Sequence, residues 1–180
     1  MRGQARRKVR YEIATPIIDV RIDDPAWYDA MPDAAALAAR AAAMALEAAG
    51  AIARVVEVAV VLSDDQAVAA LNETYRGKTG ATNVLSFPAC DAVALTRLGE
   101  AAAPPVLLGD VVLARQTLVR EAAAQGKAAG DHLMHLTVHG VLHLLGYDHE
   151  EDGEAERMED MERRALARFG IDDPYARARR

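Results

Sequence analysis

The sequence predicts an α+β fold, a single domain in which a small mixed β-sheet of about four strands packs with about five helices. The chain has 180 residues, 52% of them hydrophobic, which suffices for one buried core. Short β-branched runs alternate with longer segments in which apolar residues recur at helical spacing. The connection near 88–106 is short enough to reverse the chain direction, so the sheet should be mixed rather than purely parallel.

Four segments have the composition of strands. The second is β-branched and almost entirely apolar, as in a central strand that is covered on both faces. Pro88 ends the third segment, and Gly109 divides the fourth. The predicted strands are Ile17–Ile22, Arg54–Leu62, Val84–Phe87 and Val106–Leu113.

Five segments have the composition of helices. The first begins at Pro32, which suits a first helical position, and ends at Gly50. The second opens at a capping box formed by Ser63 and Gln66. The other predicted helices are Ala114–Gln125, Asp131–Leu145 and Glu154–Phe169, and residues 89–106 are predicted to be a loop without regular elements.

Charge is distributed unevenly along the chain. The net charge is −6, yet residues 1–10 hold five basic side chains and residues 177–180 hold three, with no acidic residue in either segment. The rest carries 13 basic against 27 acidic residues, which excludes a general phosphate-binding surface and confines any nucleic acid to a local patch. We therefore expect a flexible basic arm at 1–12, one domain at 13–170 and a C-terminal tail at 171–180.

The sequence also bears on the compartment. A single cysteine, Cys90, cannot form an internal disulfide, which is typical of a reducing compartment. The basic N-terminus is not followed by the apolar segment of a secretory signal. No stretch approaches the ~18 apolar residues that a membrane span needs. We expect a soluble cytoplasmic protein without a membrane partner.

All five histidines lie within eighteen residues of one another. His139 and His143 are four residues apart, so on a helix their imidazoles project from one face and can hold one metal ion at ~2.0–2.1 Å. Gly146 can adopt the left-handed conformation that ends a helix, and the chain can then return His149 to the same ion. Three ligands leave a fourth tetrahedral position open, as in catalytic zinc sites, and predict a zincin-like metal helix.

His132 and His135 are not expected to bind this ion. His135 and His143 are eight residues apart, or ~12 Å along a helix, and one ion cannot reach both. We therefore assign His132 and His135 to packing or hydrogen bonding. The alternative, that all five are hydrogen-bonded core histidines, would bury several imidazoles on an otherwise apolar helix, so the metal interpretation is favoured.

The spacing of the three histidines also resembles the signature of metzincin proteases. Those enzymes carry a glutamate, the general base, immediately after the first histidine. Here Gly140 occupies that position and cannot accept a proton. A zinc-dependent peptide or amide hydrolase remains an alternative, but it would need its base from elsewhere.

Residues 71–88, LNETYRGKTGATNVLSFP, form a polar segment between a predicted helix and a predicted strand. The GKT at 77–79 is similar to part of a phosphate loop, but that motif needs glycine where Asn72 stands and should open a helix. We therefore exclude a phosphate loop. Arg76 either clamps a phosphate with two hydrogen bonds and offsets charge in a phosphoryl-transfer transition state, or is an ordinary surface arginine.

Three blocks together, residues 71–88, LLGDVV at 107–112 and HGVLHLLGYDH at 139–149, resemble the YbeY family of metal-dependent endoribonucleases, the bacterial rRNA maturation factors. The blocks occur in the family's order and cover most of residues 54–175. Thr79 is a departure, because many members carry an acid at that position.

The resemblance implies one Zn²⁺ per chain on His139, His143 and His149, with Arg76 as the functionally required arginine and 13–170 as the catalytic domain. It also implies single-stranded RNA, in particular rRNA, as the substrate and the ribosomal small subunit as a partner. The roles implied are maturation of the 3′ end of the small-subunit rRNA and ribosome quality control.

The sequence leaves several alternatives open. The attacking group is either a metal-bound hydroxide or the RNA's own 2′-hydroxyl. Asp110 either orients Arg76 or a neighbouring group, or caps the adjacent loop. A non-catalytic ribosome-assembly factor with a structural zinc is a further alternative. The basic residues expected to contact RNA are Arg76 and Lys78, with Arg115, Arg120 and the basic arms as further candidates.

The segment 150–162 carries eight acidic residues against the single basic residue Arg157. We predict a solvated helix face that is turned away from the substrate. Apolar residues recur at helical spacing on another face of the same helix, where they should pack in the core. These are Met158, Met161, Ala165 and Phe169.

Overall fold

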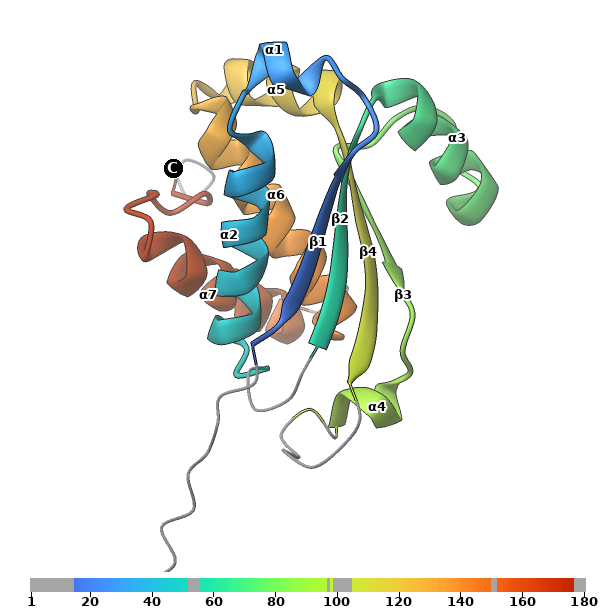
Figure 1. The fold of residues 1–180 in the computed structure, drawn as a ribbon. Helices are drawn as coiled ribbons and strands as arrows, with labels where there is room; N and C mark the ends of the chain where they lie inside the picture. The colour runs from blue at the N-terminus through green and yellow to red at the C-terminus, as the bar shows by residue number, and fades with distance from the viewer. Residues whose placement is uncertain (1–14, 52–55, 97, 99–104, 150–151, 177–180) are drawn as a thin grey trace, which may run out of the picture.

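The computed structural model describes residues 15–51, 56–96, 98, 105–149 and 152–176. The strands are β1 (Ile17–Ile22), β2 (Val56–Ser63), β3 (Val84–Pro88) and β4 (Val106–Ala114). They form one sheet in the order β1-β2-β4-β3, in which β1, β2 and β4 are parallel and β3 is antiparallel to β4 (Figure 1). The predicted mixed four-stranded sheet of an α+β domain is confirmed. The expected arm at 1–12 and the predicted start of the second strand, Arg54, lie outside the described residues.

Seven helices are present in the described part of the chain, two more than predicted. The five longer ones match predictions, whereas the two short ones have only four and five residues, too few to show helical periodicity. The prediction of a loop without elements over 89–106 is therefore wrong at 92–96, where α4 lies. The helices are α1 (Trp27–Ala30), α2 (Ala34–Ala48), α3 (Asp65–Arg76), α4 (Ala92–Thr96), α5 (Arg115–Gln125), α6 (Ala129–Leu144) and α7 (Asp152–Ala167).

The start of α3 differs from the prediction by one residue. The N-cap is Asp64, whose Oδ1 accepts a hydrogen bond from the backbone N–H of Ala67 at 2.7 Å. Ser63 still belongs to β2, and its carbonyl accepts a hydrogen bond from the indole of Trp27. The predicted capping box at Ser63 is therefore wrong, because the strand continues one residue further and the next residue takes the extended N-cap conformation.

The main core lies on one face of the sheet. Helices α2 and α6 pack there, and α7 packs against both of them, while α3 lies at the opposite face (Figure 1). Helix α6 contacts α2, α5, α7, β3 and β4, and ten of its residues are buried. A polar side chain on α6 must therefore find its partner inside the protein or in a cavity.

The opposite face is covered only in part. Helix α3 covers the portion formed by a small apolar cluster, while Ile17 and Leu107 on the same sheet remain 50% and 53% exposed. No helix among the described residues is long and apolar enough to span a membrane. The cluster under α3 consists of Val61, Val68, Leu85, Val112 and Ala114.

Gly109 allows β3 to lie close against β4. Its φ is +130°, and a Cβ at this position would lie 2.1 Å from the carbonyl oxygen of Phe87. The register between β2 and β4 shifts just before it, between Glu57 and Val58 on the β2 side. The glycine thus keeps the edge strand β3 in the position from which it lines the cavity described below.

Candidate metal centre

The structure brings together the three histidines that the sequence selects. His139 and His143 project from the last turns of α6, and His149 follows the helix. One ring nitrogen of each lies within 4.8 Å of the others, an arrangement that can hold a metal ion. The ring centroids of His143 and His149 are 5.1 Å apart, and those of His139 and His149 are 5.6 Å apart.

A tight turn at the end of α6 returns the chain to the site. Gly146 has a φ of +85° and donates its N–H to the carbonyl of His143 at 3.0 Å. The N–H of Tyr147 donates to the carbonyl of Leu142 at 3.1 Å. These two bonds close a helix end of the left-handed glycine type, and they bring His149 back beside the helix that it has just left.

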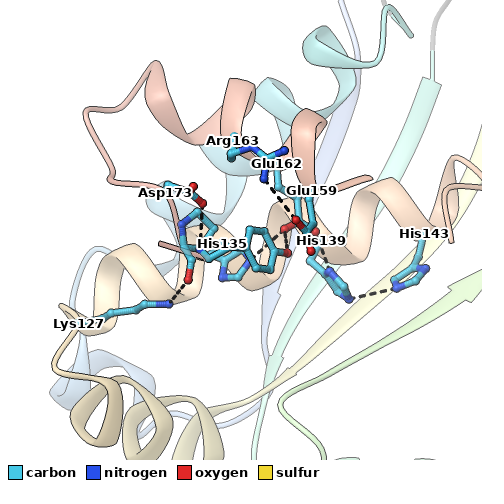
Figure 2. A network of polar contacts seen from close by, with 10 residues as sticks. Lys127, His135, His139, His143, Glu159, Glu162, Arg163 and Asp173 are labelled. Carbon is cyan, nitrogen blue, oxygen red and sulfur yellow. Dashed lines mark hydrogen bonds and ion pairs between the residues drawn. The ribbon is translucent and has the colours of Figure 1, made fainter. Parts of the chain in front are cut away.

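Hydrogen bonds at the outer nitrogens determine which ring atoms face the centre. The Nδ1 of His139 lies 2.8 Å from Oε1 of Glu162 (Figure 2). The Nδ1 of His143 lies 3.0 Å from the carbonyl of Tyr147. Because a carboxylate and a carbonyl only accept, each Nδ1 carries the proton, and each Nε2 of the neutral ring presents a lone pair.

The two Nε2 atoms of His139 and His143 face each other at 3.1 Å (Figure 2). Two lone pairs at this distance repel each other unless a cation or a proton lies between them. Two nitrogens at ~2.0–2.1 Å from one tetrahedral zinc ion lie roughly 3.3 Å apart, close to the observed separation. The donor set therefore fits a divalent metal ion.

The electrostatic environment disfavours the proton. Burial, and then the neighbouring His139 and His149, lower the pKa of His143 from 6.5 to about 4. Its ring is therefore neutral at pH 7, which is the form that binds metal. For Glu162, burial raises the pKa, but hydrogen bonds from His135 and His139 outweigh it and bring the pKa down to about 2, so this group is a carboxylate.

His132 and His135 have the hydrogen-bonding role that the sequence predicts. The Nε2 of His132 lies 3.0 Å from Glu121 Oε2, and the Nε2 of His135 lies 3.0 Å from Glu162 Oε2. Burial lowers the pKa of His132, against the opposing effect of Glu121. Neither ring belongs to the metal-holding group.

The histidines line a cavity of about 570 Å³ that also contains Arg76 and Lys78. Helix α6 and its following turn form one wall, and the end of α3, the loop after it and β3 form the other. The Nη2 of Arg76 lies 3.5 Å from the carbonyl oxygen of Ser86 on β3. The structure thus places Arg76 in the cavity that the three histidines line.

Local structure at the end of α3 explains how Arg76 reaches this position. Arg76 is the last residue of the helix, and Gly77 ends it with a φ of +63°. The buried Asn72 donates from Nδ2 to the carbonyl of Gly80 at 2.9 Å and accepts the N–H of Lys78 at 3.3 Å through its own carbonyl. The residue that excluded a phosphate loop therefore ties the following loop to α3.

Packing explains the glycine that follows His139. A Cβ on Gly140 would lie 2.5 Å from Cγ1 of Val111 and 3.2 Å from Oγ of Ser86. The Ser86 hydroxyl donates to the carbonyl of Gly140 at 2.9 Å, so α6 and β3 are in direct contact here. The glutamate of a metzincin protease does not fit at this position without moving the helix or the sheet.

Other charged residues singled out from the sequence lie elsewhere. Asp110 lines a groove on the opposite face of the sheet together with Arg21 and not the cavity that contains Arg76, so of the roles that the sequence leaves open for it, orienting Arg76 is not supported. Asp110 lies on this face because residues two apart in a strand point to the same side, and Val112 points toward α3. Arg115 pairs with Asp24 at 2.6 Å, and Arg120 lies 3.6 Å from Asp65, both outside the cavity.

Sequence reasoning missed Glu162. It belongs to the acidic segment predicted to be a solvated face, but its side chain is 0% exposed and contacts two histidines, so that prediction is wrong for this residue. A signal was present, since position 162 follows Met158 by four residues and precedes Ala165 by three, which places it on the apolar face of the helix. It also missed Tyr175, whose hydroxyl donates to Glu162.

Comparison with known proteins relates the chain to one family. A family model described as Endoribonuclease YbeY matches residues 23–170. The chain is 52% identical over 158 residues to Endoribonuclease YbeY of Paramagnetospirillum magneticum, covering 88% of this chain and 94% of that protein. It is 48% identical over 160 residues to the protein of the same name from Azorhizobium caulinodans, covering 88% and 96%.

A solved structure supports the fold. The solution structure of TM1509 from Thermotoga maritima matches with a TM-score of 0.52 and 20% sequence identity, covering 88% of this chain and 98% of that one. At this identity the likeness concerns the fold alone. The family model, in contrast, covers most of the chain and includes all three clustered histidines and Arg76. On the strength of this match and of relatives at about half identity, the chain belongs to the YbeY endoribonuclease family.

Proposed function

We propose that this protein is a zinc-dependent endoribonuclease that cleaves single-stranded RNA in the cavity between α6 and β3. The observation that carries the proposal is the pair of Nε2 lone pairs 3.1 Å apart in a cavity that also contains Arg76. The names of relatives at 52% and 48% identity identify the bond class as a phosphodiester of RNA.

His139, His143 and His149 would hold one zinc ion per chain through one nitrogen each. When bound, the ion supplies Lewis acidity toward a phosphate oxygen or a water. The neutral state of His143 and the hydrogen bonds at both Nδ1 atoms keep two of the rings in the form and orientation that ligation needs.

Arg76 acts on the phosphate from the other wall of the cavity. One nitrogen of its guanidinium lies near the Ser86 carbonyl, and the side chain lines the cavity, so the guanidinium can donate to a phosphate there and offset developing negative charge. Lys78 adds a second positive charge to the same cavity. Together they supply the local basic patch that an otherwise acidic domain requires.

The family resemblance supports a more specific role in the cell. We place the protein in the cytoplasm, where it would mature the 3′ end of the small-subunit rRNA and act in ribosome quality control together with the small subunit. The modest basic patch supports this, because RNA affinity from Arg76 and Lys78 alone would be weak and salt-sensitive, and the ribosome would supply much of the positioning. The expected domain at 13–170 would contain the three histidines and Arg76.

The two alternatives are less well supported. A peptide hydrolase shares the histidines, but the packing around Gly140 leaves no room for the usual glutamate base. A non-catalytic factor with structural zinc would use a closed site, whereas here three histidines line an open cavity with an arginine. Neither alternative accounts for Arg76.

The test compares Arg76→Ala with Arg120→Ala, an exposed arginine outside the cavity. We expect Arg76→Ala to retain zinc and lose cleavage of a single-stranded RNA, whereas Arg120→Ala retains both. The product ends distinguish the nucleophile, since a cyclic phosphate indicates attack by the 2′-hydroxyl and a 3′-hydroxyl indicates attack by water. Undiminished cleavage by Arg76→Ala, or cleavage of peptides but not RNA by the wild type, would contradict the proposal.

A further inference from the structure

The Glu162 side chain is the most deeply buried charge near the site, and the mechanism above does not use it. It lies on α7, has 0% exposure, and receives three polar contacts (Figure 2). Its Oε1 accepts from the Nδ1 of His139, and its Oε2 accepts from the Nε2 of His135 and from the hydroxyl of Tyr175. Both oxygens of this buried carboxylate therefore accept hydrogen bonds, as a buried charge requires.

We propose that Glu162 is the positioning residue of the metal centre, and that Tyr175 and His135 in turn hold Glu162 in place. This inference rests on the proposed function, because it assigns Glu162 a role toward the zinc ligand His139. The carboxylate fixes His139 as the tautomer with its proton on Nδ1, and thereby directs the Nε2 lone pair toward the ion.

The same arrangement explains why His135 lies in the protein interior. Its Nε2 donates to Glu162, which requires the proton on Nε2 and leaves a lone pair on Nδ1. The Nδ1 of His135 is buried without a hydrogen-bond partner, as a ring with only one proton to donate would leave it. His135 therefore acts on the metal centre through Glu162 and not as a ligand.

Tyr175 connects the C-terminal segment to the centre. Its ring packs edge-on against His135 with centroids 5.7 Å apart, and its hydroxyl donates to Glu162. Next to it, the carbonyl of Pro174 accepts a hydrogen bond from Lys127 Nζ at 3.2 Å. Residues of the expected C-terminal tail thus hold the carboxylate that orients His139.

Glu121 provides a matched control within the same fold. It also accepts from a buried histidine, since its Oε2 lies 3.0 Å from the Nε2 of His132, but that ring does not belong to the metal-holding group. Glu121→Gln therefore perturbs a carboxylate–histidine pair without touching a ligand. Tyr28, 59% exposed on α1, is the corresponding control for Tyr175.

The test is a zinc competition titration against a fluorescent chelator, with the folded fraction of each variant checked by circular dichroism. We expect Glu162→Gln to weaken zinc binding by about 10- to 100-fold, the usual effect of losing an outer hydrogen-bond partner. Tyr175→Phe should weaken it by a smaller factor, while Glu121→Gln and Tyr28→Phe should bind zinc as the wild type does. Wild-type affinity in both Glu162→Gln and Tyr175→Phe would overturn the proposal.

A second measurement needs no variant to fold. In the metal-free wild type, ring ¹⁵N chemical shifts should show His139 protonated at Nδ1, and protonation at Nε2 would overturn the proposal. Failure of the proposed function gives a different result. If zinc affinity depends on Glu162 but no RNA is cleaved, the positioning role stands and the nuclease assignment fails. If RNA is cleaved and zinc affinity is indifferent to Glu162, only the positioning role fails.

Discussion

The two halves of α6 use histidine in opposite ways. Toward its N-terminus, His132 and His135 each form a hydrogen bond through Nε2 to a carboxylate, that of Glu121 and that of Glu162 respectively. Toward its C-terminus, His139 and His143 each donate a hydrogen bond from Nδ1, and their Nε2 atoms face each other. Whether a histidine on this helix is a structural group or a candidate ligand therefore depends on which of its ring nitrogens is hydrogen-bonded to its surroundings.

The largest effect is expected when one histidine is removed from each half of α6. We expect His143→Ala to lower the affinity for zinc by more than roughly 100-fold. Losing a hydrogen-bond partner of a ligand lowers metal affinity by up to about that factor, and here the ligand itself is removed. His132→Ala should retain zinc but unfold more easily, because it leaves the Glu121 carboxylate without one of its partners. Zinc content per folded chain and urea unfolding measure the two effects, and equal zinc loss in both variants would contradict the division of the helix.

A second effect concerns the packing that lets α6 approach the sheet. Gly140→Ala should destabilise the protein by about 1–3 kcal/mol, because the added methyl meets Val111. Gly153→Ala on α7 is the matched control, since nothing lies within 4 Å of the new methyl, and it should stabilise the helix by up to about 1 kcal/mol. Thermal unfolding measures both, and a neutral Gly140→Ala would show that the contact is not tight.

The sequence predicts the metal-holding histidines well because they depend on local spacing. Two residues four apart on a helix, followed by a helix-ending glycine, determine most of the geometry of His139, His143 and His149. For Arg76 the local pattern leaves an ordinary surface arginine equally open, and it is the family resemblance that selects this residue. These predictions needed no knowledge of how distant segments pack.

What the sequence does not predict depends on contacts between distant segments. Glu162 is buried because α7 packs against α6, and in sequence it is one acid among many. Tyr175 reaches it from beyond the last helix. Asp110 lines a different groove from the one that contains Arg76, because strand alternation places it on the sheet face that α3 covers in part, and no local pattern specifies on which face α3 packs.

A smaller effect is expected when pH falls in the metal-free protein. Because the pKa of His143 is lowered from 6.5 to about 4, the unfolded chain binds a proton in that range that the folded chain does not. Stability should therefore decrease as pH falls through this window. Glu162, lowered from 4.5 to about 2, adds stability that is present above 4.5 and is lost as pH falls toward 2.

Urea unfolding in the presence of a chelator measures this dependence. His143→Gln should reduce the decrease in the free energy of unfolding between pH 6.5 and 4, while the decrease at lower pH remains. A metal-free wild type whose stability is constant between pH 6.5 and 4 would show that the environment of His143 does not hold it neutral.

The smallest effect concerns the basic residues. Lys78→Ala should reduce the slope of log affinity for single-stranded RNA against log salt concentration by about 0.7, the value for one lost phosphate contact. Arg120→Ala should leave the slope unchanged, because Arg120 lies outside the cavity. Equal slopes for both variants would mean that RNA follows another path across the surface.

We infer that His139, His143 and His149 together bind one divalent ion. X-ray absorption at the zinc edge of the reconstituted protein counts these ligands. We expect three imidazole nitrogens at ~2.0–2.1 Å and one further light-atom ligand, with one imidazole lost in His149→Ala. A site with fewer than three imidazoles, or a spectrum unchanged by His149→Ala, would contradict the claim.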